Sequence, residues 1–407
     1  MEIKGHFMIV ASVLYITLML ITPQGSTHKR SSSTIGLPDN VFGDGIYYVH
    51  LTRAIAEKGR LSVYENVSEV GGWYVNTGGY SMGRDGRIYI AFSPGFSLIA
   101  LPFYIIGGMP AAYLMNVIIG LATIYFMYKT CRLFVDEDTA AKTALIFGFC
   151  TTIFTYSQAY YPDTLNSLLV IASFYHLTLW SKKGGQRNII ASGAIAGLTP
   201  LVRPTLLLVA LAYFSVLCVR GRRLGAVMFA ASMIPGLLLF MAYNTVAFGS
   251  PLSTSYSSQF VINNGGGVEF KDQVGLSAWG NNLVKAFTVR MILLCLTQPV
   301  ILASIVGLIR ERDSHDIRVI AATSMLMLLT YSMRGNPLGI WCWSDRLATG
   351  IIPLLSVPFA ITMRKKQVAW GLLMVLTYAS LYLTIMSLDT GSWYLFSQFP
   401  LVEWIME

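Results

Sequence analysis

The sequence predicts an all-α polytopic membrane protein with about eleven transmembrane helices, folded as a single domain over residues 1–407. Only 12% of the residues are charged, which is about half the share found in soluble domains. In contrast, 54% are hydrophobic and the mean hydropathy is +0.58. Long apolar runs recur along the whole chain, so the composition excludes an ordinary soluble enzyme. The five cysteines show no paired or metal-like spacing, and no disulfide framework is expected.

Each predicted helix corresponds to one apolar run. A helix needs about 20 mostly apolar residues to cross a bilayer. Eleven runs come close to this length, near residues 7–23, 111–128, 140–157, 164–180, 189–202, 204–219, 224–246, 287–309, 317–333, 347–363 and 368–388. The first run follows Lys4 and has no convincing cleavage site after it. We therefore expect it to be an anchor helix rather than a signal peptide.

The distribution of basic residues predicts the orientation. Residues 92–108 are apolar but interrupted by Pro94, Gly95 and Pro102, so we expect a juxtamembrane or re-entrant segment there. If this segment does not cross, 16 of the 29 Lys and Arg lie in short segments on the same side as Lys4. The positive-inside rule assigns that side to the cytoplasm. The sequence thus predicts a multi-pass cell-membrane protein with a cytoplasmic N-terminus. Because orientation accounts for most of the formal charge of +9, no nucleic-acid partner is expected.

With this orientation every long polar segment lies outside. These are a first outer loop at 24–110, which we expect to carry juxtamembrane amphipathic helices, and further outer loops at 247–286 and 334–346. Any chemistry is therefore expected on the extracytoplasmic face.

Two acidic residues of this face are candidates for chemistry. Asp44 precedes a stretch that places Tyr47, Tyr48 and Leu51 on one helical face, typical of an amphipathic helix lying on the outer leaflet. Asp44 either caps this helix or serves as a general base. Asp163 follows Pro162 at the start of a membrane helix, where it either compensates the helix dipole or has a chemical role.

Two arginines stand out because each closely abuts a membrane helix, where a cation is costly without an anionic partner. These are Arg203 in LTPLVRPTLLL and Arg346 in IWCWSDRLATG. A lipid phosphate would be such a partner, since the guanidinium fork matches its oxygens. The alternatives are an ion pair, such as Arg346 with Asp345, or an interface anchor. Most of the other outer basic residues, a group that includes Arg290, are expected to be solvated or to reach the headgroups.

The order of several motifs resembles the GT-C superfamily, the polytopic glycosyltransferases that use polyprenyl-phosphate-linked sugars. Protein O-mannosyltransferases and aminoarabinose transferases are members of it. The resemblance covers about residues 40–350 and includes the uncharacterised bacterial and archaeal branch. It is carried by GDGIYYVHLTRAIAEKGRL (43–61), DGRIYIAFSPGFSLIALPFYIIGG (85–108), YYPDTLNSLL (160–169), YNTVAFGSPLSTSY (243–256) and WCWSDRL (341–347).

The resemblance implies a membrane glycosyltransferase that moves a sugar from a polyprenyl-phosphate donor to an acceptor hydroxyl with inversion. The acceptor would be a glycan, a lipid or a protein. The resemblance implies a base role for Asp44, maps the family's second acidic residue onto Asp163 and makes Arg346 a phosphate contact. Further candidate substrate-binding residues are Arg203, Arg53, Tyr48 and Trp343.

The chain departs from the family pattern in two motifs. Members often have Asp-Glu in the first loop, but Gly45 follows Asp44, so a two-carboxylate metal site is in doubt while a divalent cation stays open. Members often have Gly-Pro before the late arginine, whereas this chain has Ser344-Asp345. The main alternative function is a transporter or flippase of a lipid-linked or small solute, and a third is a non-catalytic membrane subunit. Convergence of Asp44, Asp163 and Arg346 on one outward cavity with a lateral opening to lipid would favour the enzyme.

Overall fold

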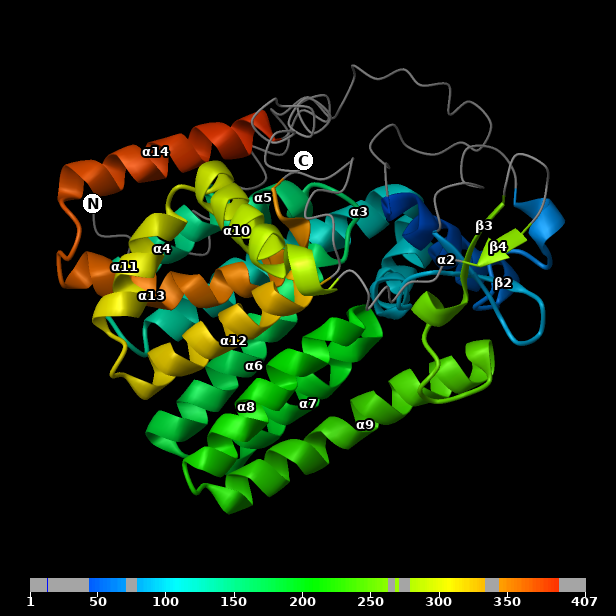
Figure 1. Ribbon diagram of the computed structural model, residues 1–407, viewed down its shortest axis with the longest axis horizontal. Helices are drawn as coiled ribbons and strands as arrows, with labels where there is room; N and C mark the ends of the chain where they lie inside the picture. Colours follow the sequence, from blue (N-terminus) through cyan, green and yellow to red (C-terminus); the bar gives the residue numbers. More distant parts are fainter. Residues whose placement is uncertain are drawn as a thin grey trace.

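The computed structural model is mostly helical in the part of the chain that it describes (Figure 1). It describes residues 44–70, 79–262, 268–270, 279–333 and 344–387, together with Val13; at 261–262, 268–270 and 279–282 it describes the backbone. The α-helices are α2 Gly45–Lys58, α3 Gly95–Cys131, α4 Glu137–Phe149, α5 Thr152–Ser157, α6 Asp163–Lys183, α7 Gln186–Val202, α8 Leu207–Val219, α9 Arg223–Phe248, α10 Trp279–Thr297, α11 Ile301–Arg310, α12 His315–Ser332, α13 Ile352–Arg364 and α14 Trp370–Met386. The 3₁₀ helices are η1 Val67–Glu69, η3 Pro204–Leu206, η4 Ser255–Ser258 and η6 Arg346–Ile351.

Several of these helices suit a bilayer. Among the described residues, three helical stretches are long and apolar enough to cross one, and a fourth qualifies if two helices joined at a sharp bend count as one span. The three are Gly95–Cys131, Arg223–Phe248 and Arg346–Arg364, and shorter apolar helices cover Pro204–Val219 and Trp370–Met386. A membrane protein is therefore supported, whereas the count of eleven spans stays a prediction. The predicted anchor helix at 7–23 lies outside the described residues.

Two predicted continuous helices are broken. The run 140–157 forms α4 and α5, which are separated where Thr151 turns extended and its hydroxyl accepts a hydrogen bond from the backbone N–H of Ile153. The run 287–309 forms parts of α10 and α11, whose axes differ by 118°. Pro299 lies at that break, where it has no N–H to continue the helical hydrogen bonds.

A kink in α3 separates the predicted juxtamembrane segment from the predicted span that follows it. Gly107 and Gly108 have non-helical backbone angles, and Gly108 has φ 64° and ψ −156°. Only glycine adopts this conformation without steric cost. The kink therefore falls at the end of the 92–108 segment and just before the run at 111–128.

A small antiparallel sheet joins two of the predicted outer loops, so the prediction of an all-α fold was wrong in this respect. Its strands, in the order β2-β1-β3-β4, are β1 Tyr80–Met82, β2 Ile88–Ile90, β3 Gln259–Ile262 and β4 Val268–Phe270. Tyr80 of β1 pairs with Ile90 of β2 on one side and with Phe260 of β3 on the other. Figure 1 shows this sheet beside α2, beyond the C-terminal end of α9.

The apolar face of α2 packs on protein, which corrects the prediction that it lies on the outer leaflet. Tyr47, Tyr48 and Leu51 are buried in a core cluster with residues of the sheet and of α3. Burial and then the charge of Arg53 lower the pKa of His50 to about 4, so its ring is neutral when it hydrogen-bonds to the Tyr80 hydroxyl at 2.8 Å. The described part of the predicted first outer loop thus packs against α3.

Close backbone contact between α7 and α9 sets the position of the long helix α9. A Cβ on Gly236 would lie 2.4 Å from the backbone carbonyl of Gly197, and one on Gly197 would lie 2.4 Å from the Met233 oxygen. Glycines at such contacts let membrane helices approach each other closely.

We expect Gly236→Ala to lower the stability of the folded protein by about 1–3 kcal/mol, because the added methyl forces α7 and α9 apart. The measurement is thermal unfolding in detergent. Gly371→Ala in α14 is the matched control, since a Cβ there has no neighbour within 4 Å and alanine favours a helix. Equal unfolding midpoints for the two variants would contradict the close packing of α7 and α9.

Candidate active site

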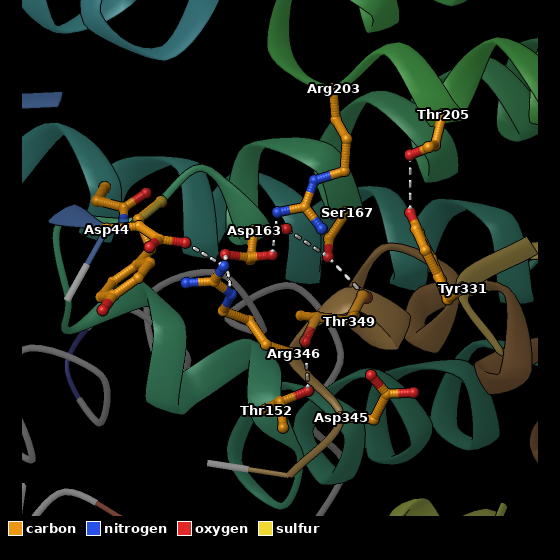
Figure 2. Close-up of polar contacts among 12 residues, drawn as sticks. Asp44, Thr152, Asp163, Ser167, Arg203, Thr205, Tyr331, Asp345, Arg346 and Thr349 are labelled. Carbon is orange, nitrogen blue, oxygen red and sulfur yellow. Dashed lines mark hydrogen bonds and ion pairs between the residues drawn. The ribbon is translucent and has the colours of Figure 1, made fainter. Parts of the chain in front are cut away.

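Four residues that the sequence singled out form one charged cluster: Asp44, Arg346, Asp163 and Arg203 (Figure 2). Arg346 forms an ion pair with Asp44 through Nη2, and its Nε lies 3.8 Å from Oδ2 of Asp163. Arg203 Nη2 donates to Oδ1 of Asp163 at 3.0 Å. The two acids and two arginines alternate in space, so the cluster is electrically balanced.

Asp44 directly precedes α2, as predicted, but it does not cap that helix. Its side chain makes no capping hydrogen bond and is instead paired with Arg346, 302 residues further along the chain. The capping interpretation is therefore wrong. Its carboxylate is 32% exposed, which leaves it accessible from the cavity described below.

Asp163 is the first residue of α6 and is almost completely buried, with 1% of its side chain exposed. Its Oδ2 accepts no hydrogen bond from the described residues and lies 3.8 Å from the Nε of Arg346. The loop before it is held by Asn116, whose side-chain amide donates to the carbonyl groups of Tyr156, Ala159 and Tyr161. The buried Asn116 of α3 thus fixes the position at which α6 begins.

Each of the two arginines lies at the end of a helix. Arg203 ends α7 with an extended backbone, and Pro204, which follows it, starts η3. Arg346 is the first residue of η6, and its guanidinium lies over the ring of Tyr161 at 5.0 Å. Both arginines are mostly buried, so each needs the anionic partner that it has.

A small cavity opens beside this cluster. Its lining residues come from α2, α7, η4, η6 and the adjoining loops: Asp44, Tyr48, Phe92, Pro162, Val202, Arg203, Tyr256, Arg346 and Leu347. Asp163 is not among them, although Pro162 directly before it is. Burial raises the pKa of Tyr48 well above its usual value, so the phenol stays neutral and can hydrogen-bond to a ligand. The cavity therefore offers one accessible carboxylate, two guanidinium groups and aromatic walls.

The remaining predicted site residues lie elsewhere. Arg53 is on α2 near His50 and Tyr104 and does not line the cavity. Trp343 lies outside the described residues. Tyr256 and Tyr161, which were not among the predicted site residues, contact the site.

Arg290 and Asp345 form a second ion pair directly behind Arg346, which sequence reasoning missed. Both side chains are fully buried, and Arg290 Nη1 donates to Oδ1 of Asp345 at 2.6 Å. Arg290 is therefore not one of the solvated basic residues, and the alternative in which Arg346 pairs with Asp345 is wrong. The missed signal was an arginine inside the apolar run AFTVRMILLCL, where it requires an anion.

The cluster does not fit a divalent cation, which the sequence left open. Arg346 occupies the space between the two carboxylates, where a cation would have to bind. Among the described residues there is no group of three or more His, Cys, Asp or Glu side chains placed to hold a metal ion. With Gly45 beside Asp44, the donor set is too small and is already neutralised by arginine.

Comparisons with known proteins agree with this fold. Residues 94–244 match the family model of dolichyl-phosphate-mannose-protein mannosyltransferases. No curated protein matches the chain. An Archaeoglobus fulgidus oligosaccharyltransferase in complex with zinc and sulfate is similar in structure, with a TM-score of 0.58, 16% identity and coverage of 95% of this chain and 53% of that one.

Two further structures are similar. One is archaeal oligosaccharyltransferase AglB from Archaeoglobus fulgidus in complex with an inhibitory peptide and a dolichol-phosphate. Its TM-score is 0.56 at 12% identity, and the match covers 95% of this chain and 55% of that one. ArnT from Cupriavidus metallidurans in the apo state has a TM-score of 0.54 at 12% identity, with 90% of this chain and 61% of that one covered. The chain thus spans little more than half of the length of these proteins. The predicted resemblance to the GT-C superfamily is confirmed at the level of the fold.

Proposed function

We propose that this chain, which has the fold of the GT-C glycosyltransferases, transfers a sugar from a polyprenyl-phosphate-linked donor to an acceptor hydroxyl with inversion. The observation that carries the proposal is the charged cluster. One accessible carboxylate and two arginines, drawn from segments far apart in the sequence, meet at one cavity. A single displacement at a phosphate-bearing anomeric carbon needs a base for the acceptor and cations for the departing phosphate, and the carboxylate and the two arginines can supply them.

The arginines are assigned to the donor phosphate. As the anomeric C–O bond breaks, negative charge grows on the departing phosphate, and fixed cations beside it stabilise the transition state. Arg346 and Arg203 both line the cavity, and a guanidinium can bind two phosphate oxygens at once. The phosphate leaves without a proton, so no carboxylic acid is required on that side.

Asp44 is assigned as the general base. It is the one carboxylate among the residues lining the cavity, and it is exposed enough to meet an acceptor. The acceptor oxygen forms the new bond to the anomeric carbon as its proton passes to Asp44, which contributes roughly 10²–10⁴-fold.

Asp163 receives a different role from the one that the resemblance implied. It is 1% exposed and does not line the cavity, so it does not meet the substrate in this arrangement. It pairs with Arg203 and approaches Arg346, and we assign it to hold the two guanidinium groups in place.

The donor class and the side of the membrane have separate support. One structure with the same fold, that of AglB, holds a dolichol-phosphate and an inhibitory peptide, which agrees with a lipid phosphate donor and an acceptor from outside the bilayer. The outer face is supported by the distribution of Lys and Arg, since the basic connections lie on the other side of the predicted spans. The acceptor class, whether glycan, lipid or protein, stays open in this proposal.

The proposal is tested with membrane vesicles of known sidedness and a panel of radiolabelled polyprenyl-phosphate sugars. We expect label to pass from one donor to an acceptor hydroxyl only when the protein is present and the donor can reach the face bearing Asp44. The configuration of the product, read by NMR, should be inverted relative to the donor. Movement of an intact lipid-linked sugar across the bilayer without transfer would support the flippase alternative instead.

A further inference from the structure

We propose that Arg290 is a positioning residue that fixes the turn from which Arg346 is presented to the donor phosphate. The inference rests on the proposed function, because it takes from there the role of Arg346 as the phosphate contact. Arg290 itself is fully buried and does not line the cavity, so any effect on the substrate has to pass through its partners.

The burial of this ion pair calls for an explanation beyond stability. Arg290 and Asp345 are both fully buried, with the donor and acceptor atoms 2.6 Å apart. Taking two charges out of water is costly, and apolar residues of similar volume often stabilise a protein as much as a buried ion pair does. A buried pair next to a site residue is therefore better explained by the geometry that it fixes.

The turn that Arg290 holds is unusual in its backbone. Ser344 has φ 59°, in the left-handed region that residues with a side chain rarely adopt. Its hydroxyl is 2.6 Å from that of Thr297 and accepts a hydrogen bond from Gln298. Arg290 and Thr297 are seven residues apart on α10 and hence share a face of the helix. One face of α10 thus holds both Ser344 and Asp345, the two residues directly before Arg346.

The two consecutive side chains point in different directions. Figure 2 shows Arg346 reaching toward Asp44 and Asp163, while Asp345 points away from them. Because the residues are adjacent, fixing the carboxylate of Asp345 against Arg290 also fixes the direction in which Arg346 leaves the backbone.

The same arginine also connects to the segment of the second site arginine. Arg290 Nη2 donates to the backbone oxygen of Tyr331 at 2.8 Å. The Tyr331 hydroxyl lies 3.3 Å from that of Thr205, two residues after Arg203 (Figure 2). The side chain of Arg290 can therefore fix the segments that carry Arg346 and Arg203 relative to each other.

The experiment compares folding with ligand binding in two variants. Arg290→Met removes the ion pair, and the double variant Arg290→Met/Asp345→Asn also removes the carboxylate left without its partner. Binding of a polyprenyl monophosphate in detergent micelles and thermal unfolding are measured for each. We expect Arg290→Met to weaken the binding of the lipid phosphate and to lower the thermal stability. The double variant should regain stability, because no buried charge is left unpaired, but should still bind the lipid phosphate at least about tenfold more weakly than the wild type.

Two further variants serve as controls. Arg290→Lys keeps the charge and should recover part of the binding, since an ammonium can meet Asp345 but reaches Tyr331 less well. Arg220→Met breaks the ion pair with Asp316 at the end of α8 away from Arg203, and should leave lipid phosphate binding unchanged.

Recovery of binding together with stability in the double variant would mean that Arg290 is only structural, and would overturn the inference. If Arg220→Met lost as much binding as Arg290→Met, the loss would be a general effect of destabilisation, and this result would overturn the inference too. If the wild type neither binds the lipid phosphate nor transfers sugar, the proposed function itself fails and the inference falls with it.

Discussion

Asp44→Asn should lower sugar transfer by about two orders of magnitude or more, because an amide cannot accept the proton of the acceptor hydroxyl. The fold should be preserved. The side chain of Asp44 makes no capping hydrogen bond to α2, so no cap is lost, and the amide oxygen of Asn can still accept from Arg346. Donor binding should be unchanged or tighter, since the variant removes an internal anion that competes with phosphate for Arg346. The measurements are the turnover rate and the apparent donor affinity.

Asp85→Asn is the matched control for this substitution. Asp85 is an exposed acid of the same predicted outer loop, in the turn between β1 and β2, and it does not line the cavity. Normal turnover in Asp85→Asn together with a large loss in Asp44→Asn would tie the effect to the cavity. Wild-type turnover in Asp44→Asn would remove Asp44 as the base.

Arg346→Lys should weaken donor use markedly although it keeps the charge, because an ammonium cannot bind two phosphate oxygens in the manner of the planar guanidinium. Arg346→Met should lower turnover by about 10²–10³-fold, the loss typical when a group that stabilises transition-state charge is removed. It also leaves Asp44 without its cation and Asp163 with Arg203 alone. Steady-state kinetics with varied donor concentration would measure both variants.

Arg84→Met provides the control for Arg346→Met, since Arg84 is an exposed arginine of the first predicted outer loop and does not line the cavity. Its kinetics should match those of the wild type. An Arg346→Met protein that folds and keeps its donor affinity and turnover would show that the phosphate binds elsewhere.

The sequence predicted the helices well because their signal is local. A run of about 20 apolar residues must become a helix in a bilayer, where backbone groups cannot bond to water. Accordingly, α6, α9 and α12 cover the predicted runs at 164–180, 224–246 and 317–333 with small shifts at their ends. The break at Pro299 within the run 287–309 was not predicted, and the 118° between α10 and α11 depends on what each helix packs against.

The sheet could not be predicted in the same way. Strands β1 and β2 are each three residues long, and β1 pairs with β3 across almost 180 residues of chain. Segments this short have no periodicity of their own, and they become strands only because folding brings their partners alongside.

The sequence by itself determined that the arginines at the ends of apolar runs need anions, because a cation there is costly without one. Only the tertiary structure decided which anion each arginine meets. Arg346 is next to Asp345 in sequence, yet it pairs with Asp44, and Asp345 pairs with Arg290. Adjacent side chains leave the Ser344–Arg346 turn in different directions, so proximity along the chain does not give proximity of charges. The cost of a buried charge is a local property, whereas the partner that offsets it is set by how distant segments pack.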